Sequence, residues 1–127
     1  MLENVTESFE IDESNIEKEL CGVGRELAFF GGYTADLKAN AATKRLELEA
    51  YDAQLALDIR KNPDEKITEG YVKERIKADP KHIELATEVI ESEKQLNKAD
   101  NYFRAHAKRA DCIIAIAYKQ RTELKHY

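Results

Sequence analysis

The feature that most constrains this chain is a stretch from Lys81 to Lys125 that contains neither glycine nor proline. Within it, apolar residues recur at spacings of three, four or seven, which places them along one face of an α-helix. These residues are Leu85, Val89, Leu96, Ala99, Phe103, Ala110, Ile114, Ala117 and Leu124. Asp79 and Pro80 precede the stretch, and aspartate and proline favour the cap and the first turn of a helix. The sequence therefore predicts one helix from Pro80 to Lys125, several times longer than the usual globular helix.

A second stretch with the same periodicity begins at Ile16 and continues to Ile59. Its apolar positions keep their phase across Gly31 and Gly32, so the pattern predicts a continuous seam even if the backbone bends there. Pro63 lacks an amide donor and stops this helix. Beyond it, Thr68 is a good N-cap for a short helix that ends at Asp79.

These elements predict an all-α fold. Two antiparallel helical arms of matched length, one before residue 62 and one after residue 80, form a long helical hairpin with the short helix near its tip. The length of 127 residues suits a single helical domain over residues 1–127. Residues 1–14 form an acidic segment at its N-terminus, and the sequence leaves open whether this segment is ordered.

The second half of the first arm is apolar on two opposite sides. The side away from the hairpin seam carries what we call the second strip: Leu46, Ala50, Ala53 and Leu57. Only one side can meet the other arm, so we expect copies of the chain to pack side by side through the second strip as a helical homo-oligomer. The alternative is that the short helix or the acidic N-terminus covers it. The last helix also begins with two apolar sides, and we expect the short helix to dock on Ile83, Ala86 and Ile90.

Signals for catalysis, cofactors and membrane insertion are weak. The chain has no HxxxH or CxxC spacing and no nucleophile in a recognisable context, so we expect no enzyme, no metal and no cofactor. Its longest apolar runs are too short to cross a bilayer. Cys21 and Cys112 suit a reducing compartment, where we expect them to be buried as small apolar residues. We expect His106, on the core side of the last helix, to be a satisfied packing residue. These features predict a soluble, cytoplasmic protein.

Acidic and basic residues are separated along the chain. Residues 1–19 carry seven carboxylates against Lys18, whereas residues 98–127 carry seven basic residues against three acidic ones, in a chain with a formal charge of −5. Such a dipole suits a protein that contacts a polyanion locally or packs head to tail with its copies. A well-solvated helical surface is the alternative interpretation.

Two groups of cations are candidates for contact with a nucleic acid. Four side chains fall within about 80° of one another on a helical projection, opposite the apolar face of the last helix. This ribbon consists of Lys94, Arg104, Lys108 and Lys119. The second group, at the end of the first helix and just beyond it, consists of Arg60, Lys61 and Lys66, with Tyr71 nearby to stack on a base. Cations that neutralise phosphates release counterions, so both groups suit binding without sequence preference. Lysines also collect on solvated faces, and that interpretation stays open.

Lys44 and Arg45 stand where the apolar seam of the first arm should continue, between Ala41 and Leu48. Charges at such positions need partners. We expect the two side chains to pair with acidic residues of the facing arm, and the alternative is that they line an internal basic surface.

The layout over roughly residues 28–125 resembles the UvsY-type recombination mediators of tailed phages. The resemblance rests on four segments: a tyrosine-containing first arm that runs into Leu46-Glu47-Leu48-Glu49-Ala50, the element Leu57-Asp58-Ile59-Arg60, the connection from Thr68 to Asp79-Pro80, and a last helix with Ala107-Lys108-Arg109-Ala110-Asp111 that continues through Arg121. In the family, a basic element at the tip is implicated in binding single-stranded DNA. Arg60 matches its arginine, whereas Asp58 stands where a lysine is expected.

The resemblance implies a ring-like homo-oligomer that contacts a RecA-like recombinase and a single-strand binding protein and that hydrolyses no nucleotide. The first hypothesis is therefore an oligomeric mediator that binds single-stranded DNA and helps to load the recombinase. The alternative hypothesis is a phage-type helical scaffold that binds a protein partner without nucleic acid. The acidic balance of the chain favours the alternative.

Overall fold

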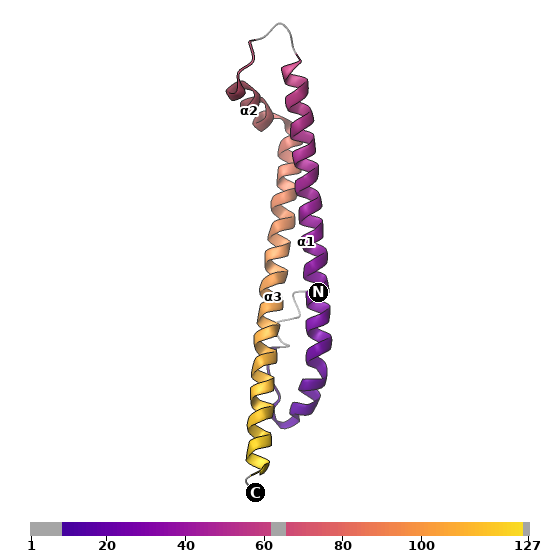
Figure 1. Cartoon of the computed structure of the whole chain (residues 1–127), viewed down its shortest axis with the longest axis vertical. Helices are drawn as coiled ribbons and strands as arrows, with labels where there is room; N and C mark the ends of the chain where they lie inside the picture. Colours follow the sequence, from indigo (N-terminus) through magenta and orange to yellow (C-terminus); the bar gives the residue numbers. More distant parts are fainter. Residues whose placement is uncertain (1–8, 62–65, 126–127) are drawn as a thin grey trace. The chain divides into compact units, whose positions relative to one another are not determined.

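The computed structural model describes residues 9–61 and 66–125 of the chain, and these residues form helices without a strand (Figure 1). A 3₁₀ turn over Glu13–Asn15 leads into α1, which spans Ile16–Arg60. Helix α2 spans Glu69–Ala78, and α3 spans Pro80–Lys125. The all-α class and the three helices expected from periodicity are confirmed. The helix stop expected at Pro63 lies outside the described residues.

The caps that delimit α2 and α3 are those that the sequence predicts. The Thr68 hydroxyl accepts a hydrogen bond from the Tyr71 amide at 3.1 Å, which satisfies a free donor in the first turn of α2. The Asp79 carboxylate accepts from the His82 amide at 3.0 Å and so caps α3, with Pro80 as its first residue. Because Asp79 has extended backbone angles, α2 and α3 are separate helices with one residue between them.

Helix α1 continues through its glycines without a break. No described glycine has a positive φ, so none is required by backbone conformation. A Cβ atom at Gly31 would lie 3.4 Å from Cε2 of Phe103, whereas one at Gly24 or Gly32 would have no neighbour within 4 Å. Close helix contact therefore accounts for Gly31 alone.

The chain consists of two compact units. Unit 1 comprises Met1–Asp36 and Asn97–Tyr127, and unit 2 comprises Leu37–Leu96. In unit 1, the first part of α1 packs against the last part of α3 with opposite chain direction, since Glu19 contacts Arg109 and the Phe30 ring stacks on His106 further along α1. Its buried apolar residues are Ile16, Phe30, Ala99, Ala110 and Ile113.

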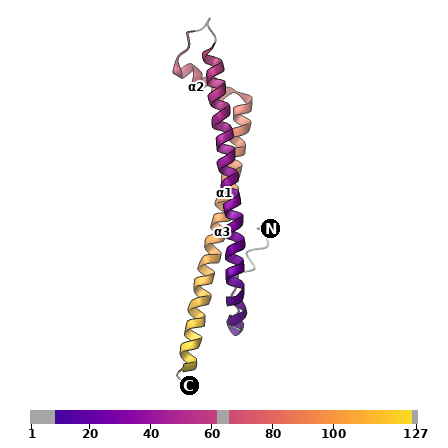
Figure 2. The same ribbon diagram turned by 45° about the vertical axis from the view of Figure 1, so that its right-hand side comes forward.

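In unit 2, the remainder of α1 packs antiparallel to the first part of α3. Lys44 contacts Glu88, and Asp52, further along α1, contacts His82, which is earlier on α3. Helix α2 lies beside the C-terminal end of α1 in both views (Figures 1 and 2). The buried apolar residues of this unit are Ala41, Ala56, Val72 and Val89. Its core is thin, because all four of these side chains are Ala or Val.

The predicted docking site of α2 is wrong. Ile83 and Ile90 are 52% and 67% exposed, so α2 does not cover them. Helix α2 instead buries Val72, and its first residue, Glu69, accepts hydrogen bonds from Arg60 at the end of α1. The sequence argument considered the apolar sides of α3 alone, whereas the contacts between Glu69 and Arg60 attach α2 to α1.

Two further expectations concerned the burial of the second strip and of the two cysteines. Leu46 and Leu57 are 65% and 51% exposed, and Ala50 and Ala53 are exposed too, so α2 does not cover the second strip. Cys21 and Cys112 are free and exposed, and the prediction that they are buried is wrong. Each lies outside the apolar stripe of its helix, where no partner helix covers it.

Candidate functional site

The cations at the end of α1 lie in unit 2, and one of them is neutralised. Both oxygens of Glu69 accept hydrogen bonds from Nη2 of Arg60, at 3.1 and 3.0 Å. Lys61 and Lys66 are exposed. The Tyr71 hydroxyl accepts a hydrogen bond from Arg75 at 3.1 Å, and the same guanidinium lies 5.8 Å from the centre of the Tyr71 ring. Tyr71 therefore already has a cation on its ring.

The ribbon of α3 divides between the units. Lys94 belongs to unit 2, whereas Arg104, Lys108 and Lys119 belong to unit 1, and all four are exposed. Arg104 forms an ion pair with Asp100 through Nε at 3.0 Å. Asp111 is also exposed, one helical turn after Lys108. Carboxylates thus interrupt the ribbon, and Lys108 and Lys119 are its least compensated members in unit 1.

Lys44 and Arg45 pair with acidic residues of α3, as the sequence predicts. Nζ of Lys44 lies 3.5 Å from Glu88, and Arg45 forms an ion pair with Glu93. The Lys44 pair lines a shallow, open depression of about 220 Å³ on the surface of unit 2, whose other lining residues are Asn40, Glu91, Ser92 and Gln95. The alternative of an internal basic surface is excluded here, because carboxylates face both cations.

A second polar cluster holds the corner between α2 and α3 against α1 in unit 2. The Tyr51 hydroxyl donates to Asp79 at 2.6 Å, and Nδ1 of His82 lies 2.7 Å from the Asp52 carboxylate. The hydrogen bond to Asp79 is the main reason that the pKa of Tyr51 rises to about 12. The same bond lowers the pKa of Asp79, with help from the His82 amide. The bond therefore favours a protonated Tyr51 and an ionised Asp79.

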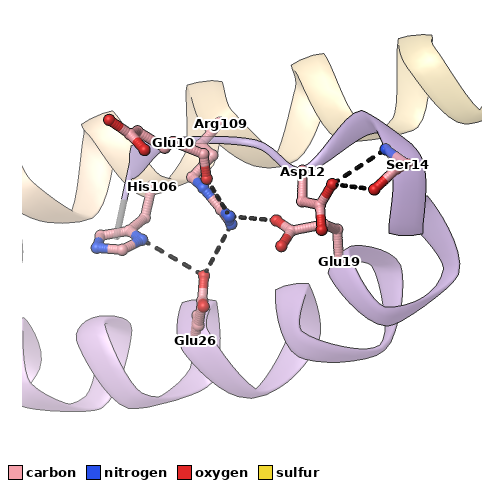
Figure 3. Close-up of polar contacts among 7 residues, drawn as sticks. All are labelled: Glu10, Asp12, Ser14, Glu19, Glu26, His106 and Arg109. Carbon is pink, nitrogen blue, oxygen red and sulfur yellow. Dashed lines mark hydrogen bonds and ion pairs between the residues drawn. The ribbon is translucent and has the colours of Figure 1, made fainter. Parts of the chain in front are cut away.

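Unit 1 contains a nearly buried arginine that bridges three segments (Figure 3). The side chain of Arg109 is 9% exposed and forms ion pairs with Glu19 and Glu26 of α1. Its Nη2 also donates to the backbone carbonyl of Glu10 at 2.9 Å. With two carboxylates against one guanidinium, the charge of Arg109 is fully compensated and stabilises contacts within the unit rather than a bound anion.

His106 lies next to this arginine, on the core side of α3 as predicted. Its side chain is 1% exposed; the ring stacks on Phe30, with 4.3 Å between the ring centres, and the tilted ring of Phe9 is centred 4.6 Å away. The expectation that its polar atoms are satisfied is wrong, because neither ring nitrogen has a hydrogen-bond partner among the described residues. Nδ1 is 3.6 Å from Glu26, beyond hydrogen-bond range. Burial lowers the pKa of His106, and the positive charge of Arg109 contributes, although Glu26 opposes both.

Metal and membrane sites are not indicated in the part of the chain that the structure describes. Residues 9–61 and 66–125 contain no group of three or more side chains suited to hold a metal ion. None of the described helices has an apolar stretch long enough to span a bilayer. The exposed features left for intermolecular contact are the lysines and the large apolar side chains.

Comparison with protein-family models found no match, and comparisons with curated proteins and with solved structures found none that reached significance.

Sequence reasoning missed the role of Arg109. The sequence-based interpretation included it only among the basic residues near the C-terminus and in the segment 107–111, although its position between His106 and Ala110 places it at the edge of the apolar stripe. An arginine at such a position requires acidic partners on the facing helix, by the argument applied to Lys44 and Arg45. That spacing was the available signal.

Proposed function

We propose that this chain is a self-assembling, single-stranded DNA-binding protein of the recombination-mediator type. The observation that carries the proposal is the state of five of the predicted cations: Lys61, Lys66, Lys94, Lys108 and Lys119 are exposed. Within residues 9–61 and 66–125, no carboxylate lies within ion-pair distance of any of them. The structure also has the order of long, short and long helices on which the family resemblance rests.

The proposed mechanism is electrostatic. Each lysine that neutralises a phosphate releases counterions, so binding is independent of base sequence and weakens with salt. A single chain with a formal charge of −5 offers few such contacts. Several chains in one assembly add their contacts through a high effective concentration. Many weak contacts can be broken one at a time, so another protein can displace this one from the strand. Such displacement is required if the protein helps a RecA-like recombinase to replace a single-strand binding protein on the DNA.

Assembly in this proposal uses the second strip. Leu46 and Leu57 expose most of their side chains beside exposed Ala50 and Ala53. Two leucines and two alanines on one helix face allow close approach of a second helix. Burial of such side chains against a copy of the chain contributes about 1.5–3 kcal/mol for each leucine.

The test is the salt dependence of binding to a fluorescently labelled oligothymidylate, measured by anisotropy. The variants are Lys61→Ala with Lys66→Ala, and Lys108→Ala with Lys119→Ala. For single strands the logarithm of affinity falls with the logarithm of salt by roughly 0.7 per phosphate contact, so each double variant should lower the slope per chain by about 1.4. Lys18→Ala with Lys38→Ala, two exposed lysines of α1 outside both groups, is the control and should leave the slope unchanged.

Absence of binding at low salt by an intact assembly would refute the DNA-binding proposal. Binding that the control variant weakens as much as the test variants would refute the assignment of the lysines.

A second candidate function is a helical scaffold that binds a protein partner without nucleic acid. Ion pairs engage Arg60 and Arg104, and carboxylates flank the ribbon, which weakens the electrostatic case. Large apolar side chains are exposed in unit 2, at Leu46, Leu57, Ile83 and Ile90. An assembled protein that does not bind the oligonucleotide in the same titration would favour this candidate.

A further inference from the structure

The segment Phe9–Asn15, which we call the N-terminal strap, packs onto α3 within unit 1. The ring of Phe9 covers His106 and lies parallel to the ring of Tyr102, with 6.5 Å between the ring centres. The backbone carbonyls of Glu10 and Glu13 accept hydrogen bonds from Arg109 and Gln120 of α3, at 2.9 and 3.0 Å. The ring of Phe9 and two backbone carbonyls thus attach the strap to α3.

Phe9 of the strap contacts His106, whose buried imidazole is in an environment that disfavours a positive charge. His106 is enclosed by Phe30 of α1, Phe9 of the strap and its own helix. The charged groups that face it are Glu26 of α1 and Arg109 of α3, while the strap presents an uncharged ring. Tyr102, four residues before His106 on α3, also packs against Phe9, and Arg109 already engages both Glu19 and Glu26.

Covering His106 therefore favours its neutral form. The faces of Phe9 and Phe30 attract an imidazolium, but loss of water around the ring outweighs that attraction, and burial is the largest cause of the lowered pKa. Phe9 supplies part of this burial, because its ring lies directly on the imidazole. Linkage is reciprocal: if closure of the strap disfavours the protonated histidine, protonation disfavours closure by the same free energy.

We infer that the N-terminal strap is an acid-sensitive latch, which is closed over α3 while His106 is neutral and which opens when His106 is protonated. Opening admits water to the imidazolium and leaves the two helices of unit 1 in place, because the strap is the least firmly held of the segments around the ring. Closure is fully favourable above the ordinary histidine pKa of about 6.5 and weakens as the pH falls below it. Each unit by which closure lowers the pKa of His106 makes closure about tenfold less favourable once the ring is protonated.

Amide hydrogen exchange of the full-length protein between pH 7.5 and 5.5 tests the latch. The observed exchange rate at each pH is divided by the intrinsic exchange rate at that pH. We expect the protection of the strap amides to fall at the acidic end while that of α1 and α3 in unit 1 persists. His106→Phe keeps an aromatic ring between Phe9 and Phe30 without a titratable group, and in this variant the protection should not change with pH.

Two further measurements keep the test decisive. His82→Asn removes a histidine of unit 2 and should leave the pH response of the strap intact. Phe9→Ala uncovers His106, so an NMR titration of its imidazole should give a higher pKa than in the unmodified protein, whether or not His106→Phe folds. Strap protection that does not respond to pH, or a His106 pKa that does not rise in Phe9→Ala, would overturn the inference.

Discussion

The side chain of Tyr51 shifts the pKa of a residue at the junction of α2 and α3. Its hydroxyl donates to Asp79, which also caps α3 through the His82 amide. Asp79 therefore joins α1 to the junction of α2 and α3. The sequence indicated that Asp79 is an N-cap, because an Asp-Pro pair just before a periodic apolar stretch is typical of the start of a helix. It did not indicate Tyr51 as a partner, because that contact depends on the register between helices.

The variant Tyr51→Phe should raise the pKa of Asp79, because it removes the largest cause of the lowered value. A carboxyl group whose pKa is lowered by folding stabilises the protein above its unfolded pKa of about 3.9, and that stability is lost as the pH falls through the folded pKa. The variant should therefore lose less stability than the unmodified protein upon acidification. A carboxyl NMR titration of Asp79 checks the shift.

Tyr118→Phe, at an exposed tyrosine of unit 1, serves as the control for this comparison. An Asp79 pKa that is the same in Tyr51→Phe and Tyr118→Phe would contradict the assigned hydrogen bond.

The elements of the fold were largely predictable. Periodicity and capping residues placed the three helices, because these signals are local and repeat many times along each element. The position of α2 was not predictable, because Ile83 and Ile90 offered an apolar surface that the structure leaves exposed. Of the candidate site, the facing-arm pairs of Lys44 and Arg45 were predicted from their position in the seam, whereas the partners of Arg60 and Arg104 were not.

Neighbouring isoleucines of α3 allow a direct measurement of what the helix contact in unit 1 contributes. Ile113 is fully buried, with 0% exposure, whereas Ile114 is 54% exposed. Ile113→Ala should lower the free energy of unfolding by about 2–5 kcal/mol, since it removes buried methyl groups and leaves a cavity. Ile114→Ala has the same effect on helix propensity and should change the free energy by less than about 0.5 kcal/mol. Urea denaturation followed by circular dichroism compares them, and similar losses in both variants would contradict the assigned face.

At the scale of the whole molecule, the second strip is an apolar surface that stays exposed among mostly charged and polar side chains. Exposed leucines of the second strip lie on α1, opposite the side that contacts α3. Sequence reasoning identified this strip from a single chain, because only one of two opposite apolar sides can face the partner arm. It could not specify what covers the strip, since that depends on a surface outside the chain itself.

Leu46→Ser with Leu57→Ser should weaken self-association by more than about 100-fold in Kd, because each copy loses two side chains worth about 1.5–3 kcal/mol apiece when buried. Sedimentation velocity across micromolar concentrations measures the effect. Ile114→Ser with Leu124→Ser changes side chains of similar exposure in unit 1 and should leave association unchanged. A monomer at all concentrations before any substitution would refute assembly through this strip.

The exposed thiols affect measurements of self-association. Cys21 and Cys112 are both accessible, one on each long helix of unit 1. In air, either thiol can form an intermolecular disulfide, and covalently linked pairs would then sediment as dimers without any helix packing. A fresh reductant is therefore part of the experiment. The same two positions accept maleimide dyes or spin labels on the native chain, so movements of α1 and α3 within unit 1 can be followed without introducing a single substitution.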